Sequence, residues 1–206
     1  IGYAIGYDWL YETYTKEQLE YLEKRAYDNF YTEYIKGFRG LSGYMAEGIS
    51  FNNNHNAVMN GGSVIMANAF MDVFPEASRY IMAGSIRASE NMLYNFAPSG
   101  NWYEGVSYGT MTLRFLAYLM ATVDKIYGTE YTLDKSEGLD QAAQFCIYMQ
   151  CPAGPYSFSD ATSNGASRSV VLEPSMLWFA SYYGDSSVQT TWFKIFHYAP
   201  TGDTLA

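Results

Sequence analysis

The stretch that decides the fold is residues 15–37, which read TKEQLEYLEKRAYDNFYTEYIKG. Thr15 followed by Gln18 forms the pattern of a capping box, which marks the start of a helix. Apolar or aromatic side chains then recur at helical spacing, at Leu19, Leu22, Ala26, Phe30 and Tyr34. Gly37 belongs to the residue type that most often ends a helix. The sequence therefore predicts one helix over residues 15–37.

Further residues that are typical of helix starts and ends follow along the chain. Pro75 suits the first turn of a helix, Gly128 closes another, and Asp134 with Glu137 reads as a second capping box. Further helices are predicted over residues 56–74, 75–96, 107–127, 134–150, 172–183 and 186–196. Alternating strand patterns are not found, so we expect an all-α chain of antiparallel helical hairpins, folded as a single domain over residues 1–206.

Composition and charge exclude several classes of protein. The chain has 206 residues, of which 49% are apolar, and its net charge is −9. A nucleic-acid partner is not expected without a basic surface, and membrane insertion is not expected without a long apolar segment. Two cysteines, Cys146 and Cys151, are too few for a disulfide framework or a metal quartet. We expect neither a metal nor a cofactor.

The connections between the predicted helices differ in length at the two ends of the bundle. Short turns connect one end, whereas the other end holds three long connections rich in Gly, Asn and Ser, at residues 38–55, 97–106 and 151–171. Long loops on a helical scaffold often carry function. If the helices alternate in direction, the segments around Asn54, Tyr108 and Asp160 share one mouth.

Each long connection contains a distinctive cluster of side chains. The clusters are FNNNHNAVMNGG at residues 51–62, WYEGVSY at residues 102–108 and YSFSDATS at residues 156–163. Simple structural readings exist for all three: asparagine caps helices, an aromatic pair can staple a helix start, and a polar loop needs no function. One cap, however, needs only one Asn, and the first cluster has five and a His.

The first two clusters carry a resemblance to a known family. NHNAVMNGG at residues 54–62, followed by WYEGVSY at residues 102–108, resembles the helical domain of heparinase II/III-like polysaccharide lyases. The opening segment AIGYDWLY at residues 4–11 is similar to the helix that leads into that domain. The resemblance implies an incomplete α/α toroid and places the family's following β-sandwich outside these 206 residues.

The resemblance implies a polysaccharide lyase that cleaves a uronic-acid polysaccharide by β-elimination. Asn54 and His55 match the segment that neutralises the substrate carboxylate, so that negative charge developing in the transition state is stabilised. Tyr108 matches the tyrosine that acts as base toward the C5 proton and then as acid toward the leaving oxygen. Free tyrosine titrates near ~10, so its surroundings must favour the phenolate at neutral pH.

The remaining residues of the motifs are expected to bind the substrate. Trp102, Tyr103 and Tyr156 are candidate stacking platforms for sugars, and Asp160 is a candidate positioning residue. Glu104 either orients the site or caps the incoming helix, and the structural role is favoured. The implied partner is an acidic polysaccharide or oligosaccharide, and the implied location is the periplasm or the cell exterior, where such polymers are met.

Two other functions fit the same residues. An inverting glycoside hydrolase of the α/α-toroid type would use Glu104 and Asp160 as its pair of carboxylates. A carbohydrate-binding domain without turnover is the third possibility. A polyanion calls for a positive cleft in this acidic chain, and the cations that would have to gather there are Lys36, Arg39, Arg79, Arg87 and Arg114.

Overall fold

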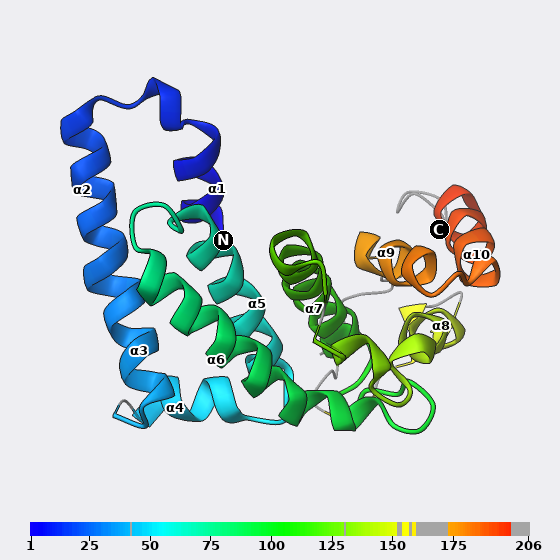
Figure 1. The fold of residues 1–206 in the computed structure, drawn as a ribbon. Coiled ribbons are helices and arrows are strands. Elements are labelled where there is room, and N and C mark those ends of the chain that lie inside the picture. Colours follow the sequence, from blue (N-terminus) through cyan, green and yellow to red (C-terminus); the bar gives the residue numbers. More distant parts are fainter. Residues whose placement is uncertain (42, 130, 152–153, 157, 160–172, 199–206) are drawn as a thin grey trace. The chain divides into compact units, whose positions relative to one another are not determined.

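The computed structural model describes residues 1–41, 43–129, 131–151, 154–156, 158–159 and 173–198, which belong to two compact units (Figure 1). The first unit comprises Ile1–Met92 and Tyr118–Leu133, and the second comprises Leu93–Ala117 and Asp134–Ala206. Helices make up nearly all of the regular structure that is described, as predicted for an all-α chain. The exception is an antiparallel pairing of two-residue strands, β1 (Gln150–Cys151) and β2 (Gly154–Pro155).

The first unit is built from consecutive helices that the sequence largely predicted. Its helices are α1 (Gly2–Trp9), α2 (Lys16–Ala26), α3 (Thr32–Phe38), α4 (Gly43–Ser50), α5 (Asn54–Ala69) and α6 (Pro75–Leu93). The capping box at Thr15 is confirmed, because the backbone N–H of Gln18 donates to Thr15 Oγ1 at 3.3 Å and the N–H of Thr15 donates to Gln18 Oε1 at 2.8 Å. Pro75 stands in the first turn of α6, as expected.

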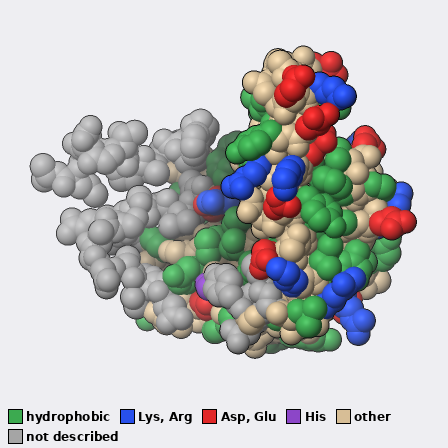
Figure 2. All heavy atoms as spheres, turned by 90° about the vertical axis from the view of Figure 1, so that its left-hand side faces the viewer, with side chains coloured by type: hydrophobic (Ala, Val, Ile, Leu, Met, Phe, Trp, Pro, Cys, Tyr) green, Lys and Arg blue, Asp and Glu red, His purple; other side chains and the backbone are tan. Residues whose placement is uncertain are grey.

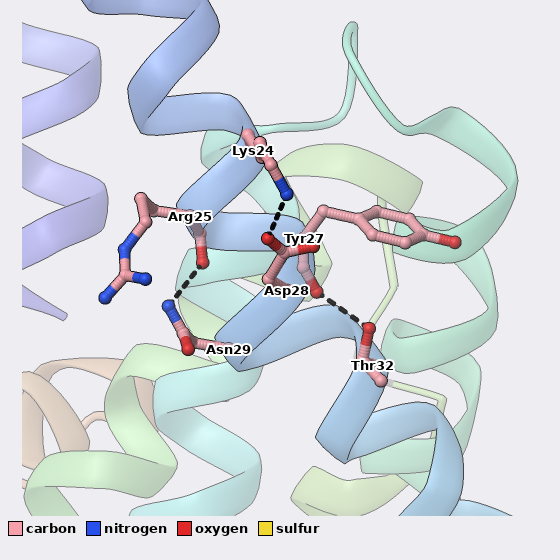
Figure 3. Close-up of polar contacts among 6 residues, drawn as sticks. All are labelled: Lys24, Arg25, Tyr27, Asp28, Asn29 and Thr32. Carbon is pink, nitrogen blue, oxygen red and sulfur yellow. Dashed lines mark hydrogen bonds and ion pairs between the residues drawn. The ribbon is translucent and has the colours of Figure 1, made fainter.

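A short π-helix, Tyr27–Tyr31, joins α2 to α3 without a break (Figure 3). Side chains help to satisfy carbonyls around this wider turn: Thr32 Oγ1 donates to the carbonyl of Tyr27 at 3.0 Å, and Asn29 Nδ2 donates to that of Arg25 at 3.0 Å. The predicted helix over residues 15–37 is therefore one continuous helical path with a local change of pitch.

This path ends at Phe38, and the glycine that follows its end lies three residues later than the sequence suggested. Gly37 is buried inside α3, and the residue with a left-handed backbone is Gly40, at φ +69°. The N–H of Leu41 donates to the carbonyl of Lys36 at 2.8 Å, which satisfies one of the carbonyls left free at the helix end. Of the two glycines, Gly37 is buried within the helix and Gly40 follows its end.

The long loop predicted over residues 38–55 is wrong, because α4 occupies residues 43–50 of it. Three glycines and two serines in this segment lower its intrinsic helix propensity. The helix forms in tertiary contact with its neighbours, and Ile49 is buried near its end. The helix predicted over residues 56–74 also differs, since α5 begins at Asn54 and ends at Ala69, before a turn that leads into α6.

Stacked aromatic rings hold the first unit together. The ring of Tyr7 on α1 lies 4.0 Å from that of Phe70, centroid to centroid, and Tyr31 packs edge-on against Phe74 at 5.1 Å. The Tyr31 hydroxyl shares a 2.7 Å hydrogen bond with Ser78 Oγ, and burial raises the pKa of Tyr31 to about 12. Most of the aromatic residues named here thus serve the core of the first unit.

The second unit contains the start of α7 (Val106–Tyr127) together with α8 (Ala142–Tyr148), α9 (Pro174–Tyr182) and α10 (Ser186–Tyr198). The long helix closed by Gly128 and the final helix pair are confirmed. The capping box predicted at Asp134 is wrong. Gly138 takes a left-handed backbone, φ +81°, and a Cβ there would lie 2.1 Å from the carbonyl oxygen of Phe96. This close approach interrupts the helix predicted over residues 134–150, so α8 begins only at Ala142.

Among the described residues, no helix has the length and apolar character needed to cross a bilayer.

Candidate functional site

The start of α5 is formed by the asparagine-rich cluster. Asn53 is the N-cap, and its Oδ1 accepts the backbone N–H of His55 at 3.1 Å. Asn54 is buried with 5% of its surface exposed. His55 is exposed, and its ring lies 6.4 Å from that of Phe51. Of the two residues predicted to neutralise a carboxylate, His55 is the one that faces solvent.

Asn56 of this cluster holds a corner of the backbone. Its Nδ2 lies within hydrogen-bond distance of three carbonyl oxygens, those of Ile49 at 3.0 Å, Phe51 at 2.7 Å and Ala88 at 2.9 Å. Those carbonyls belong to the end of α4, the link into α5, and α6. Because a helix end leaves carbonyls without partners, this amide stabilises the α4–α5 corner and ties it to α6.

Asn60 extends this arrangement one turn further along α5. Its Nδ2 lies 3.2 Å from the carbonyl oxygen of Ile49 and 2.9 Å from Asn56 Oδ1, and the side chain is fully buried. Asn56 and Asn60 are spaced to share one helix face, and both are used for architecture. The richness of this cluster in asparagine is thus explained in part by the corner.

The start of α7 is built on a buried indole. Trp102 is 0% exposed, and its Nε1 donates to Glu104 Oε2 at 3.0 Å. Its ring packs against Phe96, with centroids 5.0 Å apart. A Cβ on Gly109, in the first turns of α7, would lie 3.0 Å from Trp102 Cβ, so the glycine lets the helix approach closely.

These contacts change the roles predicted for two residues. Trp102 offers no face to solvent, so it is a core residue and does not form a sugar platform. Glu104 is 5% exposed, and its carboxylate accepts the indole N–H of Trp102, which is a structural contact; that Glu104 caps the incoming helix stays a prediction. A general acid of a hydrolase must reach a glycosidic oxygen, and this burial disfavours Glu104 in that role.

The side chains that stay accessible near this helix start are tyrosines. Tyr103 is 42% exposed, and Tyr108 is half-buried in the first turn of α7. Tyr156, which follows β2, is 62% exposed, with its ring 6.5 Å from that of Phe158. Asp160 lies outside the described residues.

The predicted site draws on both units. Asn54 and His55 belong to the first unit, whereas Tyr108, Tyr103 and Tyr156 belong to the second. That the two groups share one mouth stays a prediction. The connection over residues 38–55, which the sequence predicted as a loop, contains α4, so the helices do not alternate as that prediction assumed.

Two of the cations named from the sequence are paired with carboxylates of their own units. Lys36 pairs with Glu33 at 2.8 Å, and Arg114 binds the carboxylate of Glu173 through both Nε and Nη2. The face drawn in Figure 2 likewise shows acidic and basic side chains intermixed. Arg39 stacks over the ring of Tyr80, 5.9 Å from its centroid. Glu173 was not predicted, because nothing in its sequence surroundings points to Arg114.

Within the part of the chain that the structure describes, no group of three or more His, Cys, Asp or Glu side chains is arranged to hold a metal ion. Cys146 is a free, buried thiol, and burial raises its pKa to about 12, which leaves it protonated and unreactive at neutral pH.

No model of a known protein family matches this chain, and no curated protein matches it either.

Proposed function

We propose that this chain is the helical part of a polysaccharide lyase, an incomplete α/α toroid that cleaves a uronic-acid polysaccharide by β-elimination. One observation carries the proposal. At the two helix starts that hold the motifs, four polar or aromatic side chains make structural hydrogen bonds: Asn56, Asn60, Trp102 and Glu104. The side chains of His55 and Tyr108 keep accessible surface. A histidine donor and a tyrosine are the two groups that the elimination requires.

The start of α5 supports a role in neutralising the substrate carboxylate. His55 supplies an exposed ring N–H, and the first turn of a sixteen-residue helix carries partial positive charge. Negative charge that develops on the carboxylate as the C5 proton leaves is stabilised by both. Asn54, being buried, acts behind His55 as a positioning residue.

Tyr108 is the proposed base and acid. Its phenolate takes the proton from C5, the C5–H electron pair forms the C4–C5 double bond, and the C4–O4 bond breaks. The electron pair of that bond goes to O4, and the phenol of Tyr108 returns the proton to this oxygen. Tyr108 thus both removes the proton and returns it, and the product is an unsaturated uronate.

The substrate class also suggests where the reaction takes place. Tyr103 and Tyr156 are exposed and suit the apolar face of a sugar ring. The proposed partner is an acidic polysaccharide or oligosaccharide, and the proposed location is the periplasm or the cell exterior, because such polymers are met there.

The test is ultraviolet absorbance on heparan sulfate, hyaluronan, alginate and pectin, since the unsaturated uronate absorbs and a hydrolysis product does not. We expect a rise on at least one polymer and its loss in Tyr108→Phe. The matched control is Tyr94→Phe, because Tyr94 is 80% exposed in the second unit and lies outside the motifs. New reducing ends without absorbance would overturn the lyase in favour of a hydrolase. Binding without either product would identify a carbohydrate-binding domain.

A further inference from the structure

The first unit has an open groove along one face of α6, with a volume of about 710 Å³. Its lining on α6 runs from Tyr80 to Asn91, through residues three or four positions apart that share one helix face. Eleven residue steps of helix span about 16 Å, the length of an extended ligand rather than a single small molecule. All of the lining residues belong to the first unit.

Aromatic rings form one end of the groove. Phe38, the last residue of α3, lies against α6 at Gly84, where a Cβ would come within 2.9 Å of the Phe38 ring. Tyr80 lines the same end and is 42% exposed. Glycine at position 84 therefore lets a flat ring lie directly against the helix backbone.

The other end is polar. Arg87, Glu90 and Asn91 line it, and all three are exposed. Arg87 has no ion-pair partner among the described residues, and Arg39 adds a second guanidinium beside Tyr80. In a chain of net charge −9, the groove lining holds one arginine and one carboxylate, and a second arginine, Arg39, lies over the ring of Tyr80.

The groove leads toward the start of α5. Ala88 lines it, and the carbonyl of Ala88 accepts a hydrogen bond from Asn56 Nδ2 at 2.9 Å. His55 is the residue immediately before Asn56. The groove and the start of α5 are thus joined by one hydrogen bond within the first unit.

We propose that this groove binds an unsulfated, uronate-bearing oligosaccharide as a subsite of the lyase, an inference that rests on the proposed function. Phe38 and Tyr80 suit the apolar face of a sugar ring. Arg87 pairs with a uronate carboxylate in a bidentate fashion, and Asn91 and Glu90 bond to hydroxyl groups. Glu90 repels densely charged sulfated chains, so the groove selects a polymer with about one charge per sugar.

The test is calorimetric binding to the Tyr108→Phe protein, which is inactive if the lyase proposal holds, so that binding is measured without turnover. The probes are oligogalacturonate and oligoalginate hexamers, with a heparin hexasaccharide and cellohexaose as sulfated and neutral comparisons. We expect one of the two uronate probes to bind at least tenfold more tightly than heparin or cellohexaose. Equal binding of all four probes, or binding of none, would overturn the proposal.

Variants of the lining residues test whether the uronate probe binds in the groove. Arg87→Gln should weaken uronate binding at least tenfold, and Ala83→Trp, at an exposed position in the lining, should block it. Arg79→Gln is the matched control, because Arg79 is exposed on the same helix but outside the groove. Circular dichroism checks that each variant folds.

The two proposals fail separately in these experiments. If wild-type protein gives the absorbance rise and Arg87→Gln binds as wild type does, the groove proposal fails and the lyase stands. If the uronate probe binds through Arg87 but no polymer gives a rise, the lyase fails and the groove remains a saccharide site.

Discussion

The starts of α5 and α7 are both held in place by buried polar side chains, but the side chains are of different kinds. At α5 the side-chain amides of two buried residues, Asn56 and Asn60, donate hydrogen bonds to carbonyl oxygens at the α4–α5 corner. At α7 a buried indole donates to one carboxylate, and a glycine lets the helix approach the ring. The first arrangement depends on many neutral hydrogen bonds and the second on one large packed side chain. In both, residues that look chemically active in sequence are mainly structural.

The largest expected effect comes from Trp102→Ala. Removing a fully buried indole should destabilise the second unit by about 3–5 kcal/mol, because a cavity remains and Glu104 loses the indole donor. Urea denaturation followed by circular dichroism measures this. Trp9→Ala is the control, since Trp9 is 79% exposed. Equal losses in the two variants would break the claim that α7 starts on a packed ring.

Asn56→Ala tests the corner at α5. The variant removes the donor shared by three carbonyls and should cost about 2–3 kcal/mol of unfolding free energy. Asn29→Ala is the control, because Asn29 is exposed and donates to a single carbonyl, that of Arg25. A cost below that of the control would show that the corner does not depend on this amide.

Glu104→Gln sharpens the comparison by removing charge and keeping an acceptor. The indole N–H still finds an oxygen, so we expect a loss of about 1 kcal/mol, the difference between a charge-assisted and a neutral hydrogen bond. In the ultraviolet assay the variant should keep its activity. A protein that stays folded and loses all turnover would instead support Glu104 as a catalytic acid.

The smallest effect at neutral pH concerns Cys146, which lies near the start of α7. Because burial raises the pKa of this thiol to about 12, the unfolded chain loses its proton at lower pH than the folded protein does. Its contribution is fully present below the pKa of a free thiol and is lost as pH rises toward 12. Urea midpoints of wild type and Cys146→Ala at pH 8, 9 and 10 should therefore converge as pH rises. Parallel profiles would contradict the role assigned to burial.

How much of the site was predictable differs between the two helix starts. The sequence pointed to both segments, because runs of polar and aromatic residues at helix starts are unusual. It could not assign Trp102 to the core, since an exposed and a buried indole look alike in sequence. The groove could not be predicted from the sequence, because Phe38 and Tyr80 are 42 positions apart and meet only across two packed helices.

By itself, the sequence determined that this chain is helical and where most of its helices begin and end. Capping at Thr15, the proline at position 75 and the glycine at position 128 act through neighbours a few residues away. The tertiary structure decided the existence of α4, the break at Gly138, and which side chains of the motifs are buried. Those outcomes depend on contacts between residues distant in the chain, where packing outweighs local propensity.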